Sequence, residues 1–322
     1  MVFPTKYIFG PVPSRRLGRS LGVNNIPPKH CTYSCIYCQI GRTINLEVSR
    51  KEFYPWREVV DEVVEAVKSI GENNLDYVTY VPDGEPTLDI NLGKEIGVLK
   101  KKISVPIAVL TNGSLLFLEE VRNDLYEADT VSVKVDAFSE RIFRKINRPH
   151  PGLRLKSVLE GMVEFSKGFK GKLLTETMVV NGLNDDIVEM ENVAKFIAKL
   201  NPFKTYIAIP TRPPAEEWVK QPSEQRLFKI YKVFEKHLPG KVELLIGYEG
   251  ADFRIDKRKP VESILSITSV HPMRIDYATK LLEKAGLNPY ETLEKLKRQG
   301  KIVILKYGKY EFVMRKIHPV RK

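Results

Sequence analysis

Apolar positions along the chain alternate between helical spacing and short buried runs. Within Trp56–Ile70, five valines (Val59, Val60, Val63, Val64 and Val67) recur at the spacing of one helix face. Comparable patterns predict further helices at Leu92–Lys102, Leu118–Ala128, Leu153–Lys167, Ile187–Leu200 and Glu224–Leu238. Apolar runs predict strands at Ser20–Val23, Tyr77–Val81, Ile107–Leu110, Thr130–Val135, Leu173–Val180, Tyr206–Ile209 and Val242–Ile246. This alternation predicts an α/β fold with parallel strands and right-handed crossovers, and six to seven units favour a partial barrel over a closed one.

The pattern changes near Asp256, where we place a domain boundary between residues 1–255 and 256–322. Beyond it, helices are predicted at Val261–Ser266, Arg274–Ala285 and Pro289–Gln299, followed by strands at Ile302–Lys306 and Tyr310–Met314. Gly286 and Pro289 suit the end of one helix and the start of the next. Three helices and a hairpin predict a small winged-helix-like domain, with Pro289–Gln299 as its recognition helix.

Charge is concentrated in this last segment. The chain of 322 residues carries a formal net charge of +12, and residues 256–322 hold sixteen Lys and Arg against seven Asp and Glu. A basic segment favours a polyanionic partner such as RNA, although a solvated surface explains the charge equally simply. No membrane-length apolar stretch and no signal-peptide pattern are present, so we expect a cytoplasmic protein without a membrane partner.

The three cysteines fall within eight residues. Cys31, Cys35 and Cys38 have the spacing C-x3-C-x2-C. Thiolates favour iron–sulfur clusters or zinc. Three such ligands hold three irons of a [4Fe–4S] cluster and leave the fourth iron open, whereas a zinc site would need His30 as its fourth ligand.

With Tyr37 in the aromatic slot, this motif resembles the signature of the radical S-adenosylmethionine (SAM) superfamily. Asp83-Gly84-Glu85-Pro86 resembles the superfamily's Gly-Gly-Glu-Pro segment, with Asp83 replacing the first glycine, and Thr111-Asn112-Gly113 also matches. The segments Gly10–Gly18 and Gln39–Thr43 are similar to stand-alone members related to the wyosine (tRNA-modifying) synthases. The resemblance covers roughly residues 8–250.

The resemblance implies a partial (β/α)6 barrel that binds a [4Fe–4S] cluster and S-adenosyl-L-methionine. Cys31, Cys35 and Cys38 would be the metal ligands, and Glu85 would accept from the methionyl ammonium. We assign cofactor binding also to Tyr37, Gly84, Asn112 and Ser132. An electron donor such as ferredoxin or flavodoxin would be required.

The predicted strand Thr130–Val135 carries a polar face. Ser132, Lys134 and Asp136 alternate with valines, so they point to one side of the sheet, which in a barrel is the lumen. We assign catalytic roles to Lys134 and Asp136, with a Lys134–Asp136 ion pair at the exposed strand end as the alternative. Glu176 is ambiguous, and Arg15, Arg16 and Arg19 are candidates for an anionic substrate or for solvated surface.

Three functional hypotheses follow. The first is a radical SAM enzyme that modifies RNA, with tRNA favoured, through the basic domain. The second is a radical SAM activase or maturase that acts on a protein or peptide. The third is a metal-dependent nucleic-acid-binding regulator without catalysis, which Tyr37 and the Glu85 segment disfavour.

Overall fold

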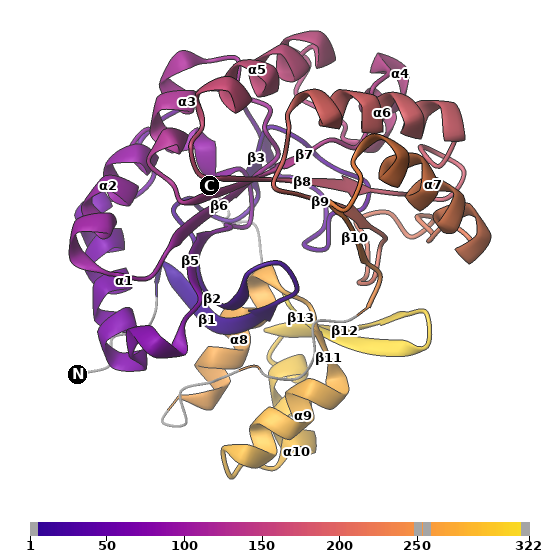
Figure 1. Ribbon diagram of the computed structural model, residues 1–322. Coiled ribbons are helices and arrows are strands. Elements are labelled where there is room, and N and C mark those ends of the chain that lie inside the picture. The colour runs from indigo at the N-terminus through magenta and orange to yellow at the C-terminus, as the bar shows by residue number, and fades with distance from the viewer. Residues whose placement is uncertain (1–5, 248–252, 254–258, 317–322) are drawn as a thin grey trace.

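The computed structural model describes residues 6–247, 253 and 259–316, and is built around one curved sheet (Figure 1). Its eight strands lie in the order β1-β2-β5-β6-β7-β8-β9-β10. Their bounds are Ile8–Ser14 (β1), Gly18–Val23 (β2), Tyr77–Tyr80 (β5), Ile107–Thr111 (β6), Thr130–Lys134 (β7), Lys172–Met178 (β8), Lys204–Ala208 (β9) and Val242–Leu245 (β10). All pairs from β2 to β10 are parallel, and β1 is antiparallel to β2.

The connections between the parallel strands are helical. The helices are Trp56–Ile70 (α1), Leu92–Lys102 (α2), Glu119–Tyr126 (α3), Glu140–Ile146 (α4), Leu155–Gly168 (α5), Ile187–Lys199 (α6) and Glu224–His237 (α7), with single turns at Glu72–Asn74 (η1) and Pro86–Leu88 (η2). They surround the outer face of the curved sheet (Figure 1). Six strand–helix units are closed by β10, which confirms the predicted partial (β/α)6 barrel.

Local sequence explains the best-predicted elements. The five valines of α1 are all buried against the sheet. At α6, the side chain of Asp186 caps the helix by accepting from the N–H groups of Val188 and Glu189, as its position before the apolar stripe predicts. Strand β1 was missed because Pro11 and Pro13 interrupt its pattern, and an edge strand tolerates proline where a central one does not.

Packing divides the apolar side chains between the two faces of the sheet. The large core lies between the sheet and α1–α7 and includes Val63, Val78 and Ile96. A small cluster on other strand positions, including Leu17, Leu174 and Tyr206, fills part of the inner side. The polar strand ends are therefore left around an inner cavity, which is where parallel α/β sheets bind ligands.

The C-terminal unit has the element order α8 (Pro260–Val270), β11 (Met273–Arg274), α9 (Ile275–Lys284), α10 (Pro289–Arg298), β12 (Ile302–Tyr307) and β13 (Tyr310–Arg315). Its three-stranded antiparallel sheet has the order β11-β13-β12. The two-residue strand β11 was not predicted, since so short a segment leaves no periodic signal. The predicted boundary at 255/256 lies outside the described residues.

The C-terminal unit shares its core with the barrel. Phe9 and Val12 of β1 pack in the same cluster as Ile264, Leu282 and other residues of α8, α9 and α10. In Figure 1 the unit, drawn in light orange and yellow, lies beside β1 and β2. Strand β1 therefore belongs to the sheet by hydrogen bonding and to the C-terminal unit by side-chain packing.

None of the helices in the described part of the chain combines the length and hydropathy that a membrane span needs.

Candidate active site

The three cysteines lie on a loop that is fastened to the ends of the barrel strands. Cys31 lies in β3 (His30–Cys31), which pairs with β4 (Asn45–Leu46). The loop is held by hydrogen bonds from Glu85 N to His30 O (3.0 Å), from Ser34 N to Asn147 O (3.1 Å) and from Ile36 N to Ile146 O (3.0 Å). A side chain at Gly84 would bring its Cβ within 1.8 Å of the His30 carbonyl oxygen. Gly84 thus permits the close approach that joins the loop to the end of β5.

A cavity of about 340 Å³ lies beside this loop and contains most of the predicted site residues. Its lining includes the three cysteines, together with Tyr37, Gly84, Glu85, Asn112, Ser132 and Lys134. Asp136 is not part of the lining. Residues from β2, β5, β6, β7 and β8 contribute to the wall, so the cavity lies at the mouth of the barrel.

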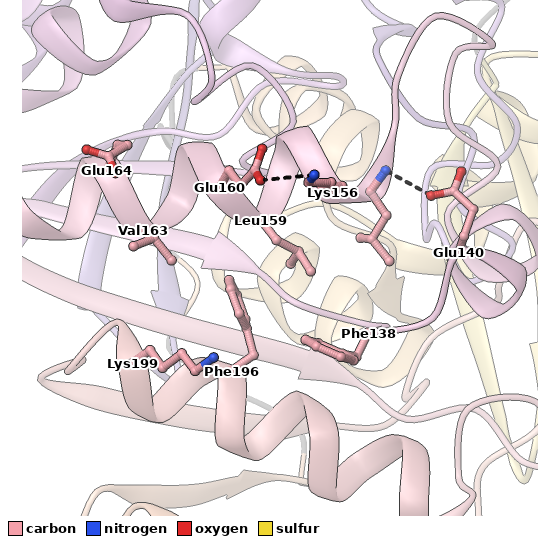
Figure 2. Close-up of a pocket in the computed structure, with 10 residues that line it drawn as sticks. Phe138, Glu140, Lys156, Leu159, Glu160, Val163, Glu164, Phe196 and Lys199 are labelled. Atoms are coloured by element: carbon pink, nitrogen blue, oxygen red, sulfur yellow. Dashed lines mark hydrogen bonds and ion pairs between the residues drawn. The ribbon is translucent and has the colours of Figure 1, made fainter.

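A second hollow, of about 460 Å³, lies between α5 and α6 on the outer helical layer (Figure 2). Leu159, Val163 and Phe196 line it, and its charged residues include an ion pair between Lys156 and Glu160. It has no cysteine in its lining, and its carboxylates are at the surface. The cysteine cavity is therefore the better candidate for chemistry, although it is the smaller of the two.

Two amide side chains are directed at the sulfur atoms. Asn112 Nδ2 lies 3.7 Å from Cys31 Sγ, and Asn147 Nδ2 lies 3.6 Å from Cys35 Sγ. Burial raises the pKa of the Cys35 thiol to about 12 and also raises those of Cys31 and Cys38. Without a metal these thiols stay protonated near neutral pH, and a metal that binds them must displace their protons.

The donor set suits a group with several metal atoms. In the part of the chain that the structure describes, no three His, Cys, Asp or Glu side chains converge closely enough to bind a single metal ion. His30, the fourth ligand of the zinc alternative, is engaged at Nδ1 by Glu47 and at Nε2 by Asn45. An iron–sulfur cube takes each thiolate on a different iron, so its ligands stand further apart than around one zinc. The residues present therefore fit an iron–sulfur cluster.

Glu85 is a buried carboxylate, 1% exposed, that is oriented by four donors. Its Oε1 accepts from Thr87 N (3.1 Å), Thr87 Oγ1 (2.6 Å) and Thr111 Oγ1 (2.5 Å). Its Oε2 accepts from Asn112 N (2.8 Å), which leaves that oxygen with further acceptor capacity. Burial raises the pKa of Glu85, and the hydrogen bonds act against this rise. A cation that entered the cavity would find the carboxylate already positioned.

Tyr37 and Asp136 form a support beneath the cysteine loop. The Tyr37 hydroxyl donates to Asp136 Oδ2, which also accepts from Asn147 Nδ2 (2.7 Å). Asp136 Oδ1 accepts from Met178 N (2.8 Å). The structure thus places Asp136 behind the Tyr37 ring, with both oxygens occupied, rather than facing the cavity.

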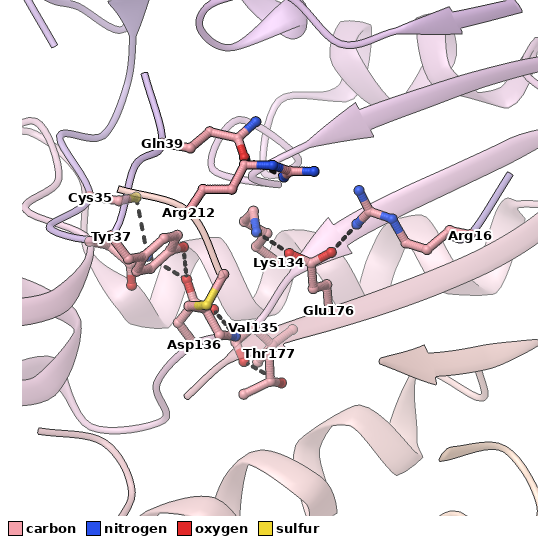
Figure 3. A network of polar contacts seen from close by, with 12 residues as sticks. Arg16, Cys35, Tyr37, Gln39, Lys134, Val135, Asp136, Glu176, Thr177 and Arg212 are labelled. Atoms are coloured by element: carbon pink, nitrogen blue, oxygen red, sulfur yellow. Dashed lines mark hydrogen bonds and ion pairs between the residues drawn. The ribbon is translucent and has the colours of Figure 1, made fainter. Parts of the chain in front are cut away.

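Lys134 forms an ion pair with Glu176, and the alternative of a Lys134–Asp136 pair is wrong. Glu176 lies opposite Lys134 in the register of β7 and β8, and also binds Arg16 from the β1–β2 turn (Figure 3). Burial alone raises the pKa of Glu176, but the charges of Arg16 and Lys134 outweigh it and lower the pKa to about 2. Arg19, in contrast, pairs with Asp76 outside the cavity.

Several cavity residues were not assigned from the sequence. Glu176 was left ambiguous, although its place opposite a lysine follows from the strand register. Arg212 follows β9 and contacts Gln39 Oε1 (2.6 Å) and His271 Nε2 (3.0 Å), and His271 comes from the end of α8. No local pattern could have predicted a contact between positions so far apart. Lys29, another lining residue, had been noted only for its closeness to the cysteines in sequence.

The family model of the radical SAM superfamily matches residues 25–197. The chain belongs to this superfamily, and is accordingly an enzyme of a class that uses SAM and an iron–sulfur cluster. A UPF0026 protein of Methanocaldococcus jannaschii is 44% identical over 310 residues, which cover 96% of each chain. A protein of Brachyspira hyodysenteriae named GTPase Obg is 32% identical over 298 residues, and the match covers 92% of this chain but only 43% of that protein.

A solved structure supports the fold. The radical SAM-like architecture of anSMEcpe with bound AdoMet aligns with a TM-score of 0.50 at 18% identity, over 76% of this chain and 64% of that chain. The predicted superfamily, fold class and enzyme class are thus confirmed. The relation to the wyosine synthases stays a prediction.

The ion triad Arg16–Glu176–Lys134 predicts a pH-dependent contribution to stability. Because the pKa of Glu176 is lowered from 4.5 to about 2, its ionised form stabilises the fold above pH ~4.5 and this contribution fades as the pH falls towards ~2. At pH 7 the Glu176→Gln variant should lose ~3 kcal/mol of unfolding free energy. Denaturant unfolding from pH 7 to 2.5 should show this gap closing, whereas the exposed control Glu160→Gln should show almost none. A gap that stays constant with pH would contradict the assignment.

Proposed function

We propose that this enzyme reductively cleaves SAM at a [4Fe–4S] cluster held by Cys31, Cys35 and Cys38, and uses the resulting 5′-deoxyadenosyl radical to modify RNA, with tRNA favoured. One observation carries the cofactor part. Three thiols, an oriented carboxylate at Glu85 and a cation at Lys134 line the same cavity at the mouth of the barrel. These are complementary to a metal cluster and to the ammonium and carboxylate of an amino acid.

The chain's own residues would divide the binding of SAM between them. The three thiolates leave one iron without a protein ligand, where the methionyl group is held. Glu85 accepts from the ammonium through Oε2, and Lys134 turns from Glu176 to the carboxylate. When bound, the reduced cluster supplies the electron that breaks the sulfonium bond.

The remaining predicted residues have supporting roles in this proposal. Asn112 and Asn147 donate to sulfur, and Ser132 contributes a hydroxyl to the wall near Lys134. Tyr37 packs beneath the cluster loop, with its hydroxyl fixed by Asp136. We therefore treat Asp136 as a positioning residue, because its oxygens are taken up by Tyr37, Asn147 and Met178.

The substrate proposal depends on the C-terminal unit, which we interpret as a winged helix. Basic side chains at its last helix and hairpin are all exposed: Lys295, Lys297, Arg298, Lys301, Lys306 and Lys309. Tyr290, at the start of α10, is 77% exposed and available for stacking on a base. Together these groups suit a nucleic acid, whose phosphates attract cations and whose bases attract aromatic rings.

The C-terminal unit also reaches the mouth of the barrel. Its His271 lines the cysteine cavity and contacts Arg212, and its Tyr307 hydroxyl donates to the Pro210 carbonyl (3.2 Å). A macromolecule bound on this unit would therefore lie next to the cavity, where a radical could reach it before it is quenched.

A protein or peptide substrate is the second candidate. It is favoured by Glu291 and Glu294, which lie on the same helix as the basic residues and would repel phosphates. In either case the cluster needs one electron from a donor such as ferredoxin or flavodoxin.

The test of the cofactor chemistry is anaerobic reconstitution with iron and sulfide, followed by incubation with dithionite and SAM, with and without tRNA. We expect 5′-deoxyadenosine from the wild type, and a new modified nucleoside by mass spectrometry when RNA is present. Cys35→Ala should lose both the cluster absorption and SAM cleavage while keeping its circular dichroism spectrum, because the loop lies outside the core. Full iron content and cleavage in this variant would refute the ligand assignment.

Glu85→Gln should retain its iron but bind SAM more weakly. Loss of a charge-assisted hydrogen bond typically costs ~1.5–3 kcal/mol, or roughly ten- to a hundredfold in affinity. Anaerobic calorimetry on the reconstituted protein measures this directly, with Asp76→Asn, a carboxylate outside the cavity, as the matched control. Equal SAM affinity in Glu85→Gln and in the wild type would remove Glu85 from the site.

The RNA proposal predicts a change in salt dependence. Replacing Lys295, Lys297 and Arg298 by Gln should weaken tRNA binding and lower the slope of log affinity against log salt by about 2–3, at ~0.7–0.9 per phosphate contact. The control replaces three exposed lysines of the outer helices, Lys68, Lys101 and Lys229. Point variants are preferable to truncation, because Phe9 and Val12 pack into the C-terminal core. If both triple variants keep the wild-type slope, the peptide substrate is favoured instead.

A further inference from the structure

Lys29 is a buried lysine whose charge is not compensated by a hydrogen bond. It is only 7% exposed, and among the described residues its Nζ has no hydrogen-bond partner. A buried ammonium without a partner is strongly unfavourable, and lysine is seldom fully buried unless it is paired. The chain therefore holds a positive charge in a place that disfavours it.

The backbone of Lys29 is also constrained. Its φ of 67° lies in the left-handed region, which non-glycine residues rarely adopt. Hydrogen bonds fix it there: Lys29 N donates to Asp83 O (2.8 Å), and its carbonyl accepts from Asn45 N (2.9 Å). The side chain consequently starts from a fixed point two residues before Cys31.

From this point the side chain reaches the cysteine cavity. Lys29 is part of the same lining as Cys31 and Cys38. A Cβ built on Gly41, in the turn after Cys38, would lie 3.5 Å from Lys29 Nζ. The ammonium interacts electrostatically with Cys38, Asp83 and Cys31. It therefore lies on the cysteine side of the cavity.

Asp83 does not neutralise this charge. In the described part of the chain Lys29 and Asp83 form no ion pair, and Asp83 Oδ1 has no hydrogen-bond partner of its own. The contact between the two residues runs through the Asp83 backbone carbonyl. Lys134, the other cation that acts on Cys38, is held by Glu176. An anion is thus missing opposite Lys29.

We propose that Lys29 is the counter-ion of the cluster bound by the three cysteines, and that its ammonium stabilises the reduced state. This inference rests on the proposed function. In the step concerned, one electron passes from a ferredoxin- or flavodoxin-class donor to the cluster, the donor is oxidised, and the cluster becomes one unit more negative. Lys29 keeps its protons and forms no bond to iron. It is a positioning residue that acts by charge.

The test is a potentiometric titration followed by electron paramagnetic resonance, on reconstituted protein without SAM. Coulomb's law at an effective dielectric constant of ~20 gives at least about a tenfold effect for unit charges ~10 Å apart. In Lys29→Met the ratio of reduced to oxidised cluster at a fixed potential should fall at least tenfold, which is 59 mV for a one-electron couple. Lys29→Arg, which keeps the charge, and Lys68→Met, which removes an exposed charge on α1, should stay near the wild-type potential.

A second measurement uses the apoprotein and does not require a cluster. If Lys29 is an uncompensated charge awaiting an anion, Lys29→Met should raise the melting temperature of the apoprotein. A residue that merely stabilises the loop would lower it. An unchanged midpoint potential in Lys29→Met with full iron content, or a lower melting temperature of its apoprotein, would overturn the inference. Failure of the wild type to assemble any cluster would instead overturn the proposed function.

Discussion

The candidate site depends on the close contact between the cysteine loop and the end of β5. At this contact Glu85 N donates to the His30 carbonyl, and Gly84 leaves room for that carbonyl to approach. One hydrogen bond thus fixes the start of the thiol-bearing loop relative to the carboxylate of Glu85. Because Glu85 is in turn oriented by Thr87, Thr111 and Asn112, the loop is aligned with the ends of two adjacent strands. The same backbone that determines where metal would bind therefore also determines where an amino-acid cofactor would bind.

Burial of charge is the second constraint on this site. Glu85, Glu176 and Lys29 are all largely removed from water, and each is satisfied in a different way. Hydrogen-bond donors surround Glu85, two cations flank Glu176, and Lys29 has neither kind of partner. In a low-dielectric cavity such differences have large electrostatic consequences, since screening by solvent is weak. This distribution supports separate roles for cofactor binding, for structural stability and for control of the electron.

Much of this arrangement could be predicted from local sequence. The valines of α1 and the cap of α6 define their helices without help from the rest of the fold, and the cysteine spacing with Glu85 identifies the superfamily. What escaped prediction depends on distant parts of the chain. The partner of Lys134 follows from the register between β7 and β8, which periodicity alone does not determine. The presence of His271 in the cavity depends on how the C-terminal unit packs, and β1 was hidden by its prolines.

The shared position of β1 links the two parts of the molecule mechanically. One face of this strand packs with α8 and α9, and its end leads directly into the turn that carries Arg16. A displacement of the C-terminal unit that carried β1 with it would move the guanidinium that holds Glu176, and so alter how readily Lys134 is released. Occupation of the outer surface could in this way be communicated to the barrel lumen through a single edge strand, with no need for a mobile lid.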